Sequence, residues 1–430
     1  MTYAETLDYL FTRLPMYQRA GATAMKKDLG NIRRLLDALG NPERRMGRIV
    51  HVAGTNGKGT TCHLIAAALQ AHGHRVGMYT SPHYRDFRER IKINAAFIPE
   101  ENVVNFVDRH RALIEEVAPS FFEITVALAF QYFAERAVDW SVIEVGLGGR
   151  LDSTNVVTPV LSVITNIGLD HTQFLGDTLE LIAGEKAGII KPGVPVVVGE
   201  TQTETLPVFE RIAAENDSPL IVADRDFPLE YYPGFPQPPG YYTTAENAPY
   251  HEPVLPDIGG PHALKNLNTA LAALYTLANL KKLNFKAEAL AKGLQNVSKG
   301  TYYVGRFQYL QRSGPTVLAD SAHNTEGLRP VTNFLRGIKQ PLHVVLGVVN
   351  DKDLTTALPL FPPTATYYFC KADIPRGLPA EELRAAAVGF GLTGEAYGSV
   401  REAYGAAVAA AGENGFVFVG GSVFVVAEVL

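Results

Sequence analysis

The sequence of 430 residues contains only two cysteines, Cys62 and Cys370. This scarcity excludes a disulfide framework and a thiolate metal cluster, because each needs several thiols. No uninterrupted apolar run is long enough to span a bilayer. The first fourteen residues carry Glu5 and Asp8 and lack the apolar core of a signal peptide. We therefore expect a cytoplasmic protein with no membrane partner.

The chain also lacks an excess of basic residues. Its formal net charge is −5, which gives no sign of a nucleic-acid partner. Hydrophobic residues make up 47% of the chain and charged residues 19%, which is typical of a globular enzyme. The length predicts two or three domains.

What the sequence does contain is a glycine-rich loop between a strand and a helix. The β-branched run at residues 49–52 predicts a buried strand, and residues 64–69 predict a helix. The loop between them reads Gly54-Thr55-Asn56-Gly57-Lys58-Gly59-Thr60. Glycines allow backbone N–H groups to turn towards phosphate oxygens, and a lysine adds positive charge for the outer phosphates. A threonine hydroxyl can ligate Mg²⁺, so the loop predicts a nucleotide site.

The loop departs from the common P-loop spacing G-x-x-x-x-G-K-[ST]. Val52 stands where the first glycine is expected, and Gly59 separates Lys58 from Thr60. A glycine-rich turn with a solvated lysine is the alternative interpretation. The flanking strand and helix favour the phosphate-binding loop.

Polar residues accompany the ends of three other predicted strands. Ser81 follows the strand at 75–80, Glu144 lies in the apolar strand at 140–146, and His171 comes after the strand at 160–165. Ligand-binding residues in open α/β sheets gather at the carboxyl ends of strands. We therefore interpret these three residues as candidate ligands of a hard cation. Taken alone, Ser81-Pro82 can be a turn, and Glu144 can be paired with Arg150.

The repeated alternation of strands and helices predicts an α/β fold with a P-loop-containing, doubly wound N-terminal domain and a smaller Rossmann-like C-terminal domain. We place the N-terminal domain at 1–298 and the C-terminal domain at 299–430. The proline- and tyrosine-rich stretch 226–261 predicts an irregular excursion or a loose hairpin. The second domain lacks a G-x-G-x-x-G sequence, so no dinucleotide site is proposed there. Predicted helices cover residues 2–14, 32–39 (capped by Asp28), 100–117, 123–137, 179–186, 262–280 and 286–297.

The order of these motifs resembles the folylpolyglutamate synthase/dihydrofolate synthase branch of the Mur ligase superfamily, over nearly the whole chain. The motifs that carry the resemblance are residues 51–60, 80–83, 121–123, 144–155, 170–171, 185–188, 305–306, 320–324 and 351–353. The resemblance implies an ATP- and Mg²⁺-dependent ligase that adds L-glutamate to dihydropteroate or reduced folates. It also implies two domains with the active site between them.

The resemblance also assigns residues. It implies ATP contacts at Gly54, Thr55, Asn56, Gly57, Gly59, Thr60, Asn266, Arg306 and Asp320. It implies Mg²⁺ ligands at Thr60, Ser81, Glu144 and His171, and a pterin site at Asp28, Phe122, Asp152 and Ser153. Catalytic parts fall to Lys58, to His323 near the glutamate end, and to Lys186, whose counterpart in the family is carbamylated. From the residues alone, Lys186 could instead be a surface lysine or one paired with Glu185.

The chain departs from the family pattern at several positions. Thr60 replaces a serine, Ser321 a glycine, Ala263 a glutamine or asparagine, and Tyr303-Val304 a Trp-Pro pair. None of these changes removes a reacting group.

The resemblance leaves three alternatives to the bifunctional ligase. The nearest is a ligase that only extends folate polyglutamates. A cell-wall Mur enzyme is more distant, because the stretch before Ile49 has no room for a uridine-nucleotide-binding domain. A P-loop nucleotide switch protein belongs to another class and leaves Glu144 and His171 without a purpose. The family's usual form is a monomer, and a requirement for a monovalent cation such as K⁺ stays open.

Overall fold

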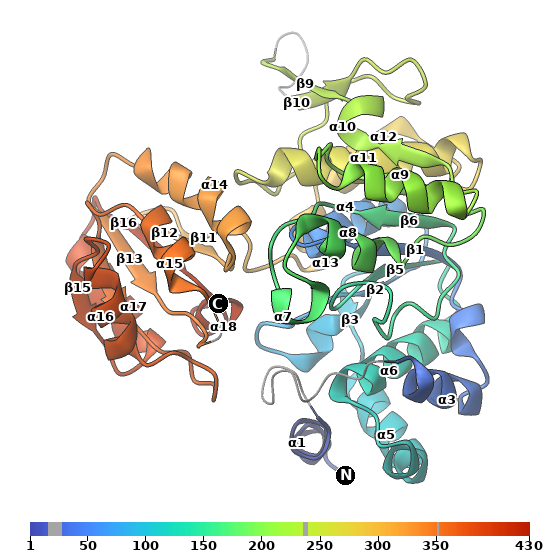
Figure 1. Cartoon of the computed structure of the whole chain (residues 1–430), viewed down its shortest axis with the longest axis horizontal. Helices are drawn as coiled ribbons and strands as arrows, with labels where there is room; N and C mark the ends of the chain where they lie inside the picture. Colours follow the sequence, from blue (N-terminus) through green and yellow to red (C-terminus); the bar gives the residue numbers. More distant parts are fainter. Residues whose placement is uncertain (16–27, 235–239, 351) are drawn as a thin grey trace. The chain divides into compact units, whose positions relative to one another are not determined.

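The computed structural model describes residues 1–15, 28–234, 240–350 and 352–430, and the chain divides into two compact units (Figure 1). The first unit comprises Met1–His83, Arg88–Ile258 and Ala263–Tyr303. The second comprises Tyr84–Phe87, Gly259–His262 and Val304–Leu430. The predicted boundary between residues 298 and 299 lies within helix α13 (Val297–Thr301) of the first unit.

The first unit is built on an eight-stranded sheet in the order β4-β3-β2-β5-β1-β6-β7-β8. Strands β2, β5, β1, β6, β7 and β8 are mutually parallel, as a doubly wound fold requires. Strands β3 and β4 add an antiparallel edge that the sequence analysis did not predict. The strands are β1 (Arg48–Ala53), β2 (Val76–Tyr79), β3 (Ile91–Ile93), β4 (Ala96–Phe97), β5 (Trp140–Glu144), β6 (Leu161–Ile164), β7 (Val196–Val198) and β8 (Leu220–Val222).

Helices enclose this sheet and bury both of its faces. Alternate residues of a strand face opposite sides. Val52 accordingly packs in a core with helices α4, α11 and α12, whereas Ala53 packs in a second core with α8 and α9. The helices of this unit are α1 (Tyr3–Arg13), α3 (Gly30–Ala38), α4 (Lys58–Ala71), α5 (Glu100–Val117), α6 (Phe121–Glu135), α7 (Thr172–Leu175), α8 (Leu179–Ala187), α9 (Leu206–Glu215), α10 (Ala223–Asp226), α11 (Ala263–Asn279), α12 (Ala287–Leu294) and α13, with 3₁₀ helices η2 (Pro42–Arg44) and η3 (Phe87–Arg90).

The proline- and tyrosine-rich stretch contains an antiparallel pair, β9 (Leu229–Tyr232) and β10 (Gly240–Thr243), which confirms the hairpin interpretation. The rings of Tyr231 and Tyr241 lie 5.3 Å apart across this pair. Aromatic contact between neighbouring strands stabilises such a pair, and Tyr241 also exchanges two backbone hydrogen bonds with Val254, each 2.8 Å long.

The second unit repeats the α/β pattern on a smaller sheet, ordered β11-β12-β16-β13-β14-β15. Its strands are parallel except for β11, which runs antiparallel at the edge. The α/β prediction for both parts of the chain is therefore confirmed. The strands are β11 (Gln308–Gln311), β12 (Thr316–Asp320), β13 (Leu342–Leu346), β14 (Thr366–Phe369), β15 (Gly394–Ala396) and β16 (Phe416–Gly420). The helices are α14 (Thr325–Arg336), α15 (Leu354–Ala357), η4 (Leu358–Leu360), α16 (Ala380–Val388), α17 (Val400–Ala411) and α18 (Val423–Ala427).

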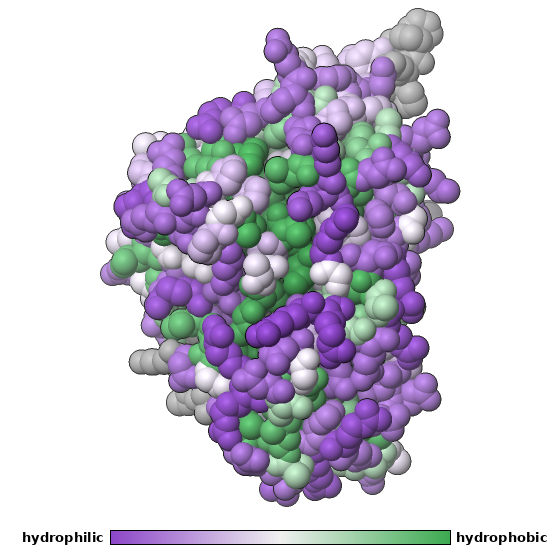
Figure 2. Space-filling model, turned by 90° about the vertical axis from the view of Figure 1, so that its right-hand side faces the viewer, coloured by the Kyte–Doolittle hydropathy of each residue, from purple (hydrophilic) through white to green (hydrophobic). Residues whose placement is uncertain are grey.

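Hydrophilic side chains dominate the face drawn in Figure 2, with hydrophobic residues gathered in its hollows. Across the described ranges, none of the helices combines the length and apolarity that a membrane crossing needs.

Candidate active site

The glycine-rich loop joins β1 to α4 and places a helix N-terminus at its centre. Gly57 precedes the first residue of α4, Lys58, and adopts a φ of +81°, a conformation that glycine reaches without strain. A side chain at this position would meet Asn266 of α11, whose Oδ1 would lie 2.1 Å from the added Cβ. The structure thus brings Asn266 against the loop. The exposed N–H groups of a helix N-terminus form a ready anion site.

Residues that follow β6 hold the loop in place. The backbone N–H of Thr55 donates to the carbonyl oxygen of Asn166, 2.9 Å away, and Asn56 N donates to Asn166 Oδ1 at 3.0 Å. The hydroxyl oxygen of Thr55 accepts from the N–H of Gly168 at 2.9 Å. These bonds fix the loop before any ligand arrives.

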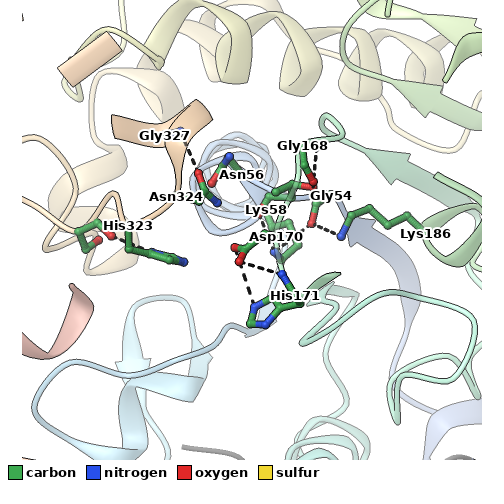
Figure 3. A network of polar contacts seen from close by, with 12 residues as sticks. Gly54, Asn56, Lys58, Gly168, Asp170, His171, Lys186, His323, Asn324 and Gly327 are labelled. Carbon is green, nitrogen blue, oxygen red and sulfur yellow. Dashed lines mark hydrogen bonds and ion pairs between the residues drawn. The ribbon is translucent and has the colours of Figure 1, made fainter. Parts of the chain in front are cut away.

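Lys58 and Lys186 meet at one carbonyl oxygen of this loop (Figure 3). Both Nζ atoms donate to Gly54 O, at 3.0 Å from Lys58 and 2.9 Å from Lys186. Lys186 is 4% exposed, so the surface-lysine alternative is wrong. The Glu185 alternative is wrong as well, because Glu185 forms its ion pair with Arg150 at 2.8 Å.

Burial, followed by the positive charge of Lys58, lowers the pKa of Lys186 to about 7. An ammonium group loses its hydration in the interior, which disfavours the charged form. Near neutral pH a large share of Lys186 is therefore the neutral amine. Sequence reasoning could not predict this, because burial depends on how α8 packs against the sheet.

Glu144 is the last residue of β5 and is 5% exposed. Its Oε2 accepts from the backbone N–H of Ser81 at 2.9 Å. A Cβ on Gly59 would lie 3.6 Å from both carboxylate oxygens, so the loop passes directly over this group. The structure therefore brings Ser81, Glu144 and the loop together. The predicted alternative of a Glu144–Arg150 pair is wrong, since Arg150 pairs with Glu185.

His171 lies beyond β6 in a left-handed conformation with a φ of 52°. Its backbone N–H donates to Asp170 Oδ1 at 2.9 Å, and its Nε2 lies 3.9 Å from Asp170 Oδ2 (Figure 3). Within the described ranges, no three or more His, Cys, Asp and Glu side chains group as metal ligands. The predicted Mg²⁺ ligands, Thr60, Ser81, Glu144 and His171, comprise two hydroxyl groups, one carboxylate and one imidazole.

Asp152 organises the loop that follows β5. Its Oδ2 accepts from the N–H groups of Gly146 and Leu147, at 3.0 and 2.9 Å. Its Oδ1 accepts from the N–H and the hydroxyl of Thr154, at 2.9 and 2.5 Å. Four donors occupy the lone pairs that an ionised carboxylate offers. In the structure, Asp152 stabilises the conformation of this loop. Its contact with a pterin stays a prediction.

A buried histidine completes this network, and the sequence analysis did not select it. The Nε2 of His51 lies 2.8 Å from Thr154 Oγ1. Thr154 gives its one hydroxyl proton to Asp152, so His51 must donate from Nε2–H and its Nδ1 carries no proton. Burial lowers the pKa of His51 to about 3, which keeps the ring neutral. A histidine inside the β-branched run at 49–52 was the only signal that could have revealed it.

Phe122 and Asp152 converge at Gly146. A Cβ on Gly146 would lie 2.5 Å from Phe122 Cζ and 3.1 Å from Asp152 Oδ2. Ser120 caps α6 and Glu123 closes the capping box, which fixes the turn that carries Phe122.

The two other predicted pterin residues are placed differently. Ser153 follows Asp152 in the same loop. Asp28 is exposed, and its Oδ1 accepts a hydrogen bond from the backbone N–H of Gly30 at 2.6 Å. The N-cap residue of α3 is Leu29, so the prediction that Asp28 occupies the N-cap position is wrong by one residue.

The second unit presents its predicted residues at the end of β12. Asp320 is 5% exposed, and its Oδ2 and Oδ1 accept from the N–H groups of Phe307 and Ala322, at 2.7 and 2.8 Å. Arg306 directly precedes Phe307. The Nδ1 of His323 lies 3.0 Å from Ser321 O, and Asn324 caps α14 (Figure 3).

The serine that replaces a family glycine is accommodated in this unit. Ser321 is fully buried, and its Oγ lies 2.9 Å from the Tyr84 hydroxyl. Asp351, from the 351–353 motif, lies outside the described residues.

Comparison with known proteins places the chain in one family. Residues 52–216 match the Mur ligase middle domain, and residues 305–423 match the Mur ligase glutamate ligase domain. A dihydrofolate synthase/folylpolyglutamate synthase of Bacillus subtilis is 37% identical over 372 residues, which cover 84% of each protein. A solved bifunctional folylpolyglutamate synthase/dihydrofolate synthase with Mn, AMPPNP and L-glutamate bound superposes with a TM-score of 0.84 and 31% identity, covering 100% of this chain and 97% of that one.

A third relative is longer than this chain. A probable bifunctional folylpolyglutamate synthase/dihydropteroate synthase of Haloferax volcanii is 36% identical over 445 residues. The match covers 100% of this chain but only 50% of that protein. The chain thus corresponds to about half of that relative. On these matches, the chain belongs to the dihydrofolate synthase/folylpolyglutamate synthase family of Mur ligases.

Proposed function

We propose that this chain uses ATP to join L-glutamate in amide linkage to dihydropteroate, forming dihydrofolate, and to reduced folates. One observation carries the proposal: a phosphate-type loop, a buried carboxylate and an aromatic-lined loop all lie at the carboxyl ends of neighbouring parallel strands. Loop residues follow β1, Glu144 and Asp152 follow or end β5, and Ser81 follows β2. Ligands bind at this edge in open α/β sheets.

The donor atoms at this edge suit a hard divalent cation. Thr60 supplies a hydroxyl oxygen, and the Glu144 carboxylate lies under Gly59 with one oxygen held by Ser81 N. Its charge also interacts with the buried cationic side chains of Arg90 and Lys92. Oxygen donors of this kind suit Mg²⁺, which retains waters and ligand phosphates in its shell. A relative with bound Mn and AMPPNP supports a divalent metal with the nucleotide.

A carboxylate and an amine do not condense to an amide in water unless the carboxylate is first activated. The substrate carboxylate attacks the γ-phosphorus of ATP, its P–O bond to ADP breaks, and an acyl phosphate forms. The glutamate amine then attacks the acyl carbon, phosphate leaves, and the amine loses a proton. Binding and charge neutralisation by fixed groups supply most of the rate gain in phosphoryl transfer. Lys58 would exchange its hydrogen bonds to Gly54 O and Thr55 O for contacts with the outer phosphates.

Lys186 serves this site as a carbamate. Carbamylation requires a neutral amine, which adds CO₂ and releases one proton. The buried Lys186, with its pKa lowered to about 7, is such an amine. The carbamate would present oxygen atoms to a cation where the unmodified side chain presents a proton donor.

Substrate ends are assigned by side-chain chemistry. The Phe122 ring beside Gly146 offers an apolar face for a pterin, next to the loop of Asp152 and Ser153. From the second unit, Arg306 and Asp320 serve the nucleotide and His323 the glutamate.

The test is phosphate release from Mg-ATP and L-glutamate with dihydropteroate, with tetrahydrofolate, or without a pterin. We expect turnover with both pterins and none without them. A Lys58→Ala preparation, purified identically, is the control for contaminating ATPase. Turnover with tetrahydrofolate alone would reduce the function to polyglutamylation. Release that ignores both pterin and glutamate would overturn the ligase and favour the nucleotide switch.

A further inference from the structure

Thr60, the candidate metal ligand of the phosphate loop, contacts the last residue of the first unit. Thr60, in the first turn of α4, has its Oγ1 3.1 Å from the hydroxyl oxygen of Tyr303. Tyr303 is the last residue of the first unit, and Val304 begins the second. A contact made by the side chain that would ligate the cation therefore lies directly at the connection between the units.

His63, one turn further along α4, secures the same segment. Its Nδ1 lies 2.6 Å from Thr301 Oγ1, and Thr301 donates its hydroxyl proton to Val297 O at 2.6 Å. His63 must therefore be the Nδ1–H tautomer and donate to Thr301. The His63 ring also meets the Tyr303 ring edge-to-face, with centroids 5.2 Å apart. These contacts leave the Tyr303 ring little freedom, so its hydroxyl is held beside Thr60.

The direction of the Thr60–Tyr303 hydrogen bond matters for a cation. A hydroxyl that gives a lone pair to a metal becomes a stronger proton donor and needs an acceptor for its proton. A tyrosine oxygen can accept that proton, whereas a tryptophan indole only donates. The tyrosine that stands here in place of the usual tryptophan thus provides a group that the indole cannot.

We propose that Tyr303 is a positioning residue for the nucleotide-bound divalent cation: its phenolic oxygen accepts the Thr60 hydroxyl proton and leaves the lone pairs of Thr60 Oγ1 for the ion. The inference rests on the proposed function, since it requires a cation with the nucleotide. Groups of this kind, which bind a metal ligand but not the metal, commonly change metal affinity 10- to 100-fold.

The test measures Mn²⁺ binding to the full-length protein saturated with ADP, by electron paramagnetic resonance of free Mn²⁺. We expect Tyr303→Phe to weaken Mn²⁺ binding about tenfold, while ADP binding in the presence of a metal chelator stays unchanged. Tyr275→Phe is the matched control. It removes another tyrosine hydroxyl of this unit, one that bonds only the backbone oxygen of Tyr250 in the contacts described, at 3.3 Å.

A double variant separates this part from a general packing effect. If Tyr303 acts through Thr60, Thr60→Val loses Mn²⁺ affinity by itself, and Tyr303→Phe adds no further loss in that background. Wild-type affinity in Tyr303→Phe, an equal loss in Tyr275→Phe, or a full additional loss in the double variant would overturn the inference. Failure of the wild-type ADP complex to bind Mn²⁺ would instead refute the metal in the proposed function, and the inference with it.

Discussion

Thr154 is the most informative position at which to perturb the protein, because two buried groups depend on one hydroxyl. Thr154→Val keeps the shape of the side chain and removes the oxygen that joins His51 to Asp152. The variant loses a hydrogen bond to a carboxylate, worth about 1.5–3 kcal/mol, and strands the buried His51 Nε2–H at a cost of about 1–3 kcal/mol. Because such terms are not additive, we expect a loss of about 3 kcal/mol in the free energy of unfolding.

The chain provides its own probe for this measurement. It has one tryptophan, Trp140, which is 1% exposed in β5 and pairs with Arg48 of β1, the strand of His51. Urea unfolding followed by tryptophan fluorescence therefore reports on the sheet of the first unit. Thr276→Val is the control, because its buried hydroxyl bonds the helix carbonyl of Ala272 and strands no partner. We expect that variant to lose less than about 1 kcal/mol.

Comparing the stabilities of Thr154→Val and Thr276→Val tests the hydrogen bonds that join His51, Thr154 and Asp152. A Thr154→Val variant no less stable than Thr276→Val would refute the assignment of His51 as a proton donor to Thr154. In a double-mutant cycle, His51→Leu and Thr154→Val should be strongly non-additive, because either change breaks the same bond. Additive losses would show that the two side chains act independently.

Three further predictions concern the loop and its lysines. Lys58→Ala should lower kcat/KM by at least about 100-fold with an unchanged thermal midpoint, and activity within tenfold of wild type would refute its part in phosphoryl transfer. Burial lowers the pKa of Lys186 to about 7, and protonation below that pH removes the nucleophilic amine. Native mass spectrometry in bicarbonate should therefore show one added CO₂ at pH 8 and less of this adduct at pH 6. The control variant Lys186→Arg should show none. Equal adduct at both pH values would contradict this. Gly57→Ala should weaken ADP binding at least about tenfold, because the added Cβ would lie 2.1 Å from Asn266 Oδ1. Gly73→Ala is the control, since Gly73 also has a positive φ (+89°) but open space around it, and this variant should bind ADP normally. Equal ADP binding by both variants would count against the close approach of Asn266 to the loop.

The sequence by itself determined many of the helices and strands, though not the edge strands β3 and β4, and it determined the chemistry of the glycine-rich loop. Helix α5 spans Glu100–Val117, as its apolar spacing predicted, and the β-branched run at 49–52 lies within β1. These features are local, since the period of apolar residues and the position of glycine are written in consecutive residues. The order of strand-end motifs was sufficient to predict the family. The predicted roles of individual site residues stay predictions.

Only the tertiary structure decided which polar groups meet. Glu144 accepts from Ser81, Arg150 takes Glu185, and Lys186 is buried against Gly54, although residues near in sequence suggested other partners. The neutral state of His51 follows from its burial, and its Nε2–H tautomer follows from a bond to a residue 103 positions away. Such pairings depend on strand order and on the packing of helices over the sheet, which bring distant residues together at one edge. Charge state follows from those contacts, because burial and hydrogen bonding, not residue type alone, set the pKa.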